Sequence, residues 1–130
     1  MRERPLSPHL SIYRFRYTLT SSISNRITGI VLSGGLLLLV YWLVAAASSE
    51  QAYDDAYRTL SHGAARVLLA VILTAFVYHL LAGIRHLIWD MGYALERDQA
   101  RASAWLIGAA TLVISGVLIY FVFLAGGASP

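Results

Sequence analysis

The stretch VLLAVILTAFVYHLLAGIRHLIWD, residues 67–90, decides the fold of this chain. Its part from 67 to 84 carries no charged side chain, and two other uncharged stretches, 27–47 and 102–130, are of comparable or greater length. Each is long enough to supply the ~20 apolar residues with which an α-helix crosses the hydrocarbon core of a bilayer. With 58% hydrophobic residues in a chain of 130, the sequence predicts an all-α integral membrane protein with three transmembrane helices.

The three helices leave little of the chain for anything else. We expect a polar tail at 1–20, a transmembrane anchor at 21–126 and a short C-terminal end at 127–130. Within the anchor, the spans are predicted at about 24–47, 64–88 and 102–126. No loop is long enough to form a separate catalytic domain, and the chain has no cysteine with which to hold an iron–sulfur cluster.

Arginine is distributed unevenly between the two ends of the predicted helices, and the chain has no lysine. The tail and the link between the second and third spans carry most of the arginines, whereas the other link carries only Arg58 and Arg66. The positive-inside rule therefore places the N-terminus in the cytoplasm or a mitochondrial matrix. Because the chain starts at Met1 without a cleavable presequence, we expect a bacterial inner membrane. The net charge of +3 indicates topology and not a nucleic-acid site.

A stripe of polar and small residues lies along the helix predicted over the opening stretch. Its members are three or four residues apart, so they share one face of an α-helix. They are His79, Gly83, His86 and Asp90. Apolar side chains between Leu68 and Phe76 continue the same face toward the other end of the helix.

His79 allows two readings. An ionisable residue inside a membrane segment is costly, so it faces protein, a cofactor or water, and neutral imidazole is a common iron ligand. Gly83 removes a side chain one turn further on, where the edge of a flat macrocycle needs room. The other reading is a histidine hydrogen-bonded between helices, with Gly83 as a packing contact. The stretch alone leaves both readings open.

Ser22 and Arg26 share a face at the start of the first span because they are four residues apart. Arg26 is either an anchor that extends toward the membrane surface or a cation placed beside a hydroxyl group. In the second case the pair is suited to hydrogen-bond a carbonyl or carboxylate group. The arginine asymmetry places both residues at the same membrane surface as Arg85, His86 and Asp90.

Three motifs, taken in this order, resemble a known family. They are RPLSPHLSIY at 4–13, SISNRITG at 22–29 and HLLAGIRHLIWD at 79–90. Together with the three-span layout, they resemble the larger cytochrome b membrane-anchor subunit of succinate dehydrogenase (succinate:quinone oxidoreductase, respiratory complex II). The resemblance covers nearly the whole chain, and the third motif and the order of all three are specific.

The resemblance implies a role for several residues. His79 matches the family's axial ligand of haem b, and Ser22 and Arg26 match its ubiquinone-site serine and arginine. Arg26 is also placed to reach a haem propionate, and His86 lies toward the same propionate side. The family usually has histidine at the position of Asn25, which can donate a hydrogen bond but cannot carry a proton or a charge.

The resemblance also implies partners. His79 and His86 are about 10 Å apart along one helix, so they cannot bind opposite sides of one haem iron. The second axial ligand is expected from a second membrane-anchor subunit, with haem b shared between the two chains in one helical bundle. A flavoprotein subunit would oxidise succinate and an iron–sulfur subunit would pass on the electrons, so this chain carries no succinate-oxidising site.

Three other functions remain open at this point. One is the anchor of a related fumarate reductase, because neither the quinone type nor the direction of electron flow can be read from this chain. Another is a small helical transporter or channel subunit lined by Arg26 and His79, although a pore needs polar residues along a whole span and the face between Leu68 and Phe76 is apolar. The third is a structural anchor without haem, against which His79 and Gly83 argue.

Overall fold

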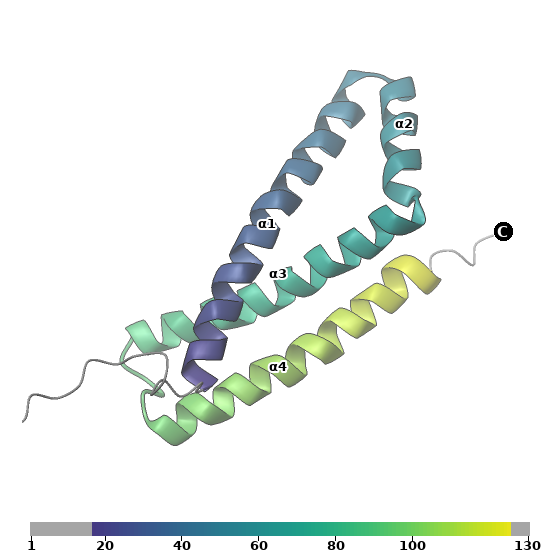
Figure 1. Cartoon of the computed structure of the whole chain (residues 1–130). Coiled ribbons are helices and arrows are strands. Elements are labelled where there is room, and N and C mark those ends of the chain that lie inside the picture. The colour runs from purple at the N-terminus through teal and green to yellow at the C-terminus, as the bar shows by residue number, and fades with distance from the viewer. Residues whose placement is uncertain (1–16, 126–130) are drawn as a thin grey trace, which may run out of the picture.

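The computed structural model describes residues 17–125, which form four α-helices and one π-helical segment (Figure 1). The elements are α1 (Tyr17–Ser48), α2 (Glu50–Ser61), α3 (Gly63–Asp90), α4 (Arg97–Ile119) and the π-helical segment η1 (Tyr120–Ala125). No strand occurs in this described part of the chain. Most of the polar tail, including the motif at 4–13, and the C-terminal end at 127–130 lie outside the described residues.

Three helices are long and apolar enough to cross a membrane. They comprise Leu19–Ser48, Gly63–Asp90 and Arg97–Phe123, so the third combines α4 with the first residues of η1. The predicted class, an all-α protein with three membrane spans, is confirmed. The helices continue beyond the uncharged stretches, so Arg85 and Arg101 also lie on helical turns.

The central helix of the three is α3, because both α1 and α4 pack along it and have less contact with each other. Figure 1 shows α4 running alongside α3, whereas α1 crosses α3 and diverges from it toward α2. The short helix α2 connects the separated ends of α1 and α3 (Figure 1).

Two glycines of α1 lie beside side chains of α3, and the approach is closest at Gly35. A side-chain carbon built on Gly35 would lie 2.7 Å from Cγ2 of Ile72, and one built on Gly29 would lie 3.4 Å from Cε1 of His79. Small residues at such contacts allow helix backbones to approach each other closely in membranes. Gly34, the neighbour of Gly35 in the chain, would meet nothing within 4 Å. The contact therefore depends on Gly35 and not on Gly34.

We expect Gly35→Ala to destabilise the packing of α1 on α3, because the added methyl group overlaps with the branched side chain of Ile72. Overpacking of this kind costs about 1–3 kcal/mol. The measurement is thermal unfolding of the purified complex in detergent, with Gly34→Ala as the matched control. Adding Ile72→Ala to Gly35→Ala should restore part of the loss. Equal melting temperatures for the two glycine variants would contradict the close contact.

The link between the first two membrane helices contains α2, a helix that the sequence analysis did not predict. Ser49 caps its start by accepting a hydrogen bond from the backbone N–H of Ala52 at 3.1 Å. Ala56 is fully buried, and Tyr53 packs near Trp42 of α1 with ring centroids 6.4 Å apart. These side chains lie on one face of α2. The rest of the segment is polar, so the sequence did not indicate a helix with an apolar face. With 12 residues, α2 is too short to cross a bilayer.

Specific contacts occur in the link between α3 and α4 and at the opposite end of α3. After α3, Gly92 adopts a φ of +83°, a left-handed conformation that glycine tolerates, and Trp89 Nε1 donates a hydrogen bond to the Ala94 carbonyl at 3.1 Å. At the opposite end, Arg66 Nη2 donates to the Phe123 carbonyl at 2.9 Å, and its guanidinium lies 5.5 Å from the centre of the Phe123 ring. The first contact orders the link, and the second joins α3 to the segment that follows α4.

The large apolar side chains mostly point away from the protein. Among the described residues, the buried apolar ones are all small: Ala45, Ala56, Ala75, Val77 and Ala82. Ile30 and Leu112 are both 73% exposed. Apolar surface of this extent is stable where lipid or another subunit covers it.

Candidate functional site

His79 lies half-buried between α3 and α1, with its ring against the turn of α1 that runs from Asn25 to Gly29. Its Nδ1 atom is 3.2 Å from Thr28 Oγ1 and 3.2 Å from the backbone carbonyl oxygen of Asn25. Within residues 17–125 the ring makes no hydrogen bond through Nε2. One ring nitrogen is thus used in the contact between helices, and the other is available to a ligand.

Gly83, one turn beyond His79, faces open space. A side-chain carbon built on it would have no atom of the described chain within 4 Å. Gly83 is therefore not a contact between helices of this chain, which was one of the two readings of the sequence. Further along, His86 is half-buried with its ring 5.3 Å from that of Trp89, and Asp90 is exposed.

Ser22 and Arg26 lie on the first turns of α1, where Ser22 is half-buried and Arg26 is exposed. The same part of α1 carries Asn25 and Thr28, which contact His79. The structure therefore brings the two predicted clusters onto adjoining turns of α1 and α3. The side-chain oxygen Oδ1 of Asn25 is buried and has no hydrogen-bond partner in the described part of the chain. A buried polar atom in this condition is costly, so Asn25 is a further group suited to a polar ligand.

Arg85, which the sequence places at this membrane surface, is buried, and its burial was not predicted. It is 6% exposed, and its Nη2 donates to Ser21 Oγ at 2.7 Å. Its guanidinium lies 4.2 Å from the centre of the Trp89 ring, and Tyr78 Oη donates to the Ser21 carbonyl at 3.4 Å. These contacts hold the start of α1, next to Ser22, against α3. Spacing within one helix contains no signal for a partner on another helix, so Ser21 could not be identified from the sequence.

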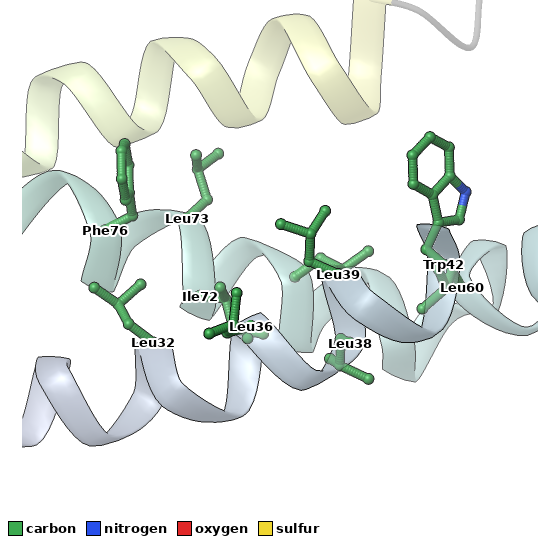
Figure 2. A pocket seen from close by; sticks show the side chains of 11 residues that line it. Leu32, Leu36, Leu38, Leu39, Trp42, Leu60, Ile72, Leu73 and Phe76 are labelled. Atoms are coloured by element: carbon green, nitrogen blue, oxygen red, sulfur yellow. The ribbon is translucent and has the colours of Figure 1, made fainter. Parts of the chain in front are cut away.

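An apolar groove of about 760 Å³ lies between α1 and α3 on the side of α2. Figure 2 shows leucine, isoleucine and aromatic side chains lining it, from Trp42 and Leu60 at one end to Leu32 and Phe76 at the other. Phe76 lies one turn before His79 on α3. The residues that line the groove are apolar. This agrees with the apolar face between Leu68 and Phe76 that the sequence predicts, and it argues against an ion path beside His79.

The donor set of the site is a single imidazole. Within residues 17–125, no group of three or more His, Cys, Asp or Glu side chains is placed to hold a metal ion. A single histidine suits a metal that a macrocycle already holds, since the macrocycle supplies the other nitrogen ligands.

The chain is similar to known proteins over most of its length. A family model described as Succinate dehydrogenase/Fumarate reductase transmembrane subunit matches residues 1–118. The chain is 42% identical over 122 residues to a succinate dehydrogenase cytochrome b556 subunit from Paracoccus denitrificans, which covers 92% of this chain and 94% of that relative. It is 41% identical over 110 residues to a cytochrome b560 subunit of the enzyme from Reclinomonas americana (80% and 76% covered). It is 36% identical over 114 residues to the mitochondrial cytochrome b560 subunit from Mus musculus (86% and 65% covered).

Proposed function

The chain belongs to the family of succinate dehydrogenase/fumarate reductase transmembrane subunits, and we propose that it is the membrane anchor of a succinate dehydrogenase. In this role it binds haem b together with a second membrane-anchor subunit and forms part of the ubiquinone-reduction site. Its other partners are an iron–sulfur subunit and a flavoprotein subunit, the second of which carries the succinate-oxidising site. The names of its relatives, which are cytochrome b subunits, support a haem-binding role.

The observation that carries this proposal is the setting of His79. The contact with α1 occupies Nδ1, so Nε2 is the nitrogen available to iron. Gly83 leaves open space one turn further along the same face. An imidazole held at one nitrogen and available at the other is the donor that haem iron takes, so the residues present fit the group. When bound, haem b supplies a one-electron carrier inside the membrane.

The second axial ligand is proposed to come from another chain. His86 lies about 10 Å further along α3, and His62 caps the opposite end of that helix by accepting a hydrogen bond from the Ala64 backbone at 3.4 Å. Besides His79, these two are the only histidines within residues 17–125. This supports a haem shared with a second anchor subunit, whose own helices would cover part of the exposed apolar surface.

Ser22 and Arg26 are proposed to bind the quinone. Arg26 is exposed and is therefore open to a molecule that arrives from outside the chain. Its guanidinium, with the Ser22 hydroxyl one turn away, would orient a quinone carbonyl and stabilise the negative charge that develops on its oxygen. Arg26 and His86 are also proposed to lie on the propionate side of haem, because guanidinium and imidazole N–H groups can donate hydrogen bonds to a carboxylate.

The proposed orientation places the N-terminus in the cytoplasm and the protein in a bacterial inner membrane. The start of α1, the end of α3 and the start of α4 lie at one end of the bundle (Figure 1). This end carries Arg26, Arg85, Arg97 and Arg101, whereas the end near α2 carries Arg58 and Arg66. The positive-inside rule supports this orientation, and an arginine-rich inner surface suits the docking of the soluble redox subunits.

A reduced-minus-oxidised visible spectrum of the purified complex, with all co-purifying subunits, tests the proposal. We expect a sharp b-type α band after dithionite reduction, together with flavoprotein and iron–sulfur subunits. We also expect succinate-dependent ubiquinone reduction to be faster than quinol-dependent fumarate reduction, and the reverse would identify a fumarate reductase. A complex without haem and without redox subunits would favour the small helical transporter instead.

A further inference from the structure

Thr28 on α1 contacts His79, the proposed ligand of the haem iron, but the proposed function gives Thr28 no role. We infer that Thr28, together with the backbone carbonyl of Asn25, is a positioning residue that fixes His79 as the Nδ1–H tautomer and keeps Nε2 ready for haem iron. This role deepens the proposed function and rests on the proposed haem site. It concerns residues of this chain, whose contacts the structure gives directly.

The Asn25 carbonyl decides which nitrogen of His79 carries the proton. Its oxygen lies 3.2 Å from Nδ1 and can only accept a hydrogen bond. A neutral imidazole has one N–H group and one lone pair. If Nδ1 held the lone pair, it would face the lone pairs of the carbonyl oxygen at hydrogen-bond distance. The arrangement is favourable only when Nδ1 carries the proton, and Nε2 then holds the lone pair.

The Thr28 hydroxyl reinforces this assignment because its own proton has other acceptors. Thr28 Oγ1 lies 2.9 Å from the Ser24 carbonyl oxygen and 3.0 Å from that of Asn25, and it donates to them. Because the hydroxyl proton is directed toward these carbonyls, the oxygen lone pairs are left for another donor. His79 Nδ1 lies 3.2 Å from this oxygen. The hydroxyl thus acts as a second acceptor for the same N–H group. A threonine hydroxyl that bonds back to the preceding turn has a restricted χ1 angle, so this acceptor has a fixed position.

Gly29 lies beside the ring of His79. A side-chain carbon built at this position would lie 3.4 Å from His79 Cε1, so the imidazole lies close to α1 here. The two acceptors at Nδ1 limit rotation of the ring and its movement away from α1. A ligand histidine held in this way keeps its orientation before the metal binds.

The acceptors at Nδ1 also affect the electron density of the ring. An N–H group that donates to oxygen makes the opposite nitrogen of the imidazole more basic. A more basic ligand favours the oxidised iron and therefore lowers the midpoint potential of the haem. Thr28 is consequently expected to influence both how firmly the haem is held and its midpoint potential.

The test compares Thr28→Val, which removes the hydroxyl but keeps the branched shape, with Thr28→Ser, which keeps the hydroxyl. Thr74→Val is the matched control, because Thr74 is half-buried on α3 and bonds to its own helix at the Ala70 carbonyl, at 2.9 Å. The complete complex is purified for each variant. The haem midpoint potential is measured by redox titration of the α band, and haem loss by transfer to apomyoglobin.

We expect Thr28→Val to raise the midpoint potential and to make haem loss about 10-fold faster, the lower end of the range for such outer partners because the Asn25 carbonyl remains. Thr28→Ser and Thr74→Val should match the wild type. If Thr28→Val has the midpoint potential and the rate of haem loss of the wild type, the positioning role is overturned. The proposed function would still stand in that case, provided that the wild-type complex contains haem. A change in Thr28→Ser as large as in Thr28→Val would overturn the positioning role too, because packing and not the hydroxyl would be responsible. A wild-type complex without haem would contradict the proposed function itself.

Discussion

Replacing His79 by alanine is expected to remove haem from the complex while leaving the three membrane helices in place. In the described chain, His79 is the one histidine that lies inside a membrane helix, has Nδ1 held by α1 and has open space one turn further along. Its Nε2 is therefore the expected ligand atom for iron. Without it, the haem would keep only the ligand from the partner subunit. We therefore expect the b-type α band to be lost or shifted to that of a misligated haem.

The helices should survive this substitution because the Thr28 hydroxyl that contacts His79 keeps other partners on α1. The Thr28 hydroxyl still donates to the carbonyls of Ser24 and Asn25 when the imidazole is gone. The measurement is haem content by pyridine haemochrome relative to flavin, with subunit composition as a check on assembly. His62→Ala is the control, since His62 is exposed at the opposite end of α3. An unchanged haem spectrum in His79→Ala would disprove the ligand assignment.

Arg26→Ala should reduce succinate-dependent quinone reduction strongly and leave succinate oxidation by an artificial soluble acceptor unchanged. The guanidinium is proposed to stabilise the charge that develops on the quinone oxygen, and removal of one such donor costs about 10²-fold in rate. Succinate oxidation takes place on another subunit in the proposed complex, so it does not depend on this side chain. The two activities are measured on the same membranes.

Controls separate this role of Arg26 from a general effect of charge. Arg101→Ala removes an exposed arginine near the start of α4, at the same end of the bundle, and is expected to keep both activities. Arg26→Lys keeps the charge but loses the planar fork of donors, so we expect an intermediate rate of quinone reduction. Because Arg26 is exposed, its removal should not disturb the helix packing. Equal losses in both assays would show that Arg26 supports assembly and not quinone binding.

The number of membrane helices could be predicted from the sequence because it depends on a one-dimensional property. A helix rises about 1.5 Å per residue and the hydrocarbon core has a fixed thickness, so the length of an uncharged stretch is sufficient. The stripe from His79 to Asp90 could be predicted for a similar reason, since helical periodicity places residues three and four apart on one face. The short helix α2 escaped prediction because its apolar face is narrow and depends on Trp42 of α1 for cover.

Two arginines show where periodicity stops being informative. Both Arg26 and Arg85 lie beside uncharged stretches and look alike in the sequence. In the structure Arg26 is exposed, whereas Arg85 is buried against Ser21 and Trp89. Arg85 is buried because it packs against Ser21 of α1, a contact between helices that periodicity within one helix does not reveal.

The sequence by itself determined the membrane class, the three long helices and the identity of His79, Ser22 and Arg26 as candidates. The tertiary structure alone decided which atoms of α1 meet the His79 ring and which ring nitrogen remains available. The physical reason is that periodicity relates residues within one helix, whereas the rotation and depth of one helix against another are set by side-chain packing. Here the absence of a side chain at Gly35 lets α1 approach α3, and the packing of the two helices places Thr28 and the Asn25 carbonyl against His79.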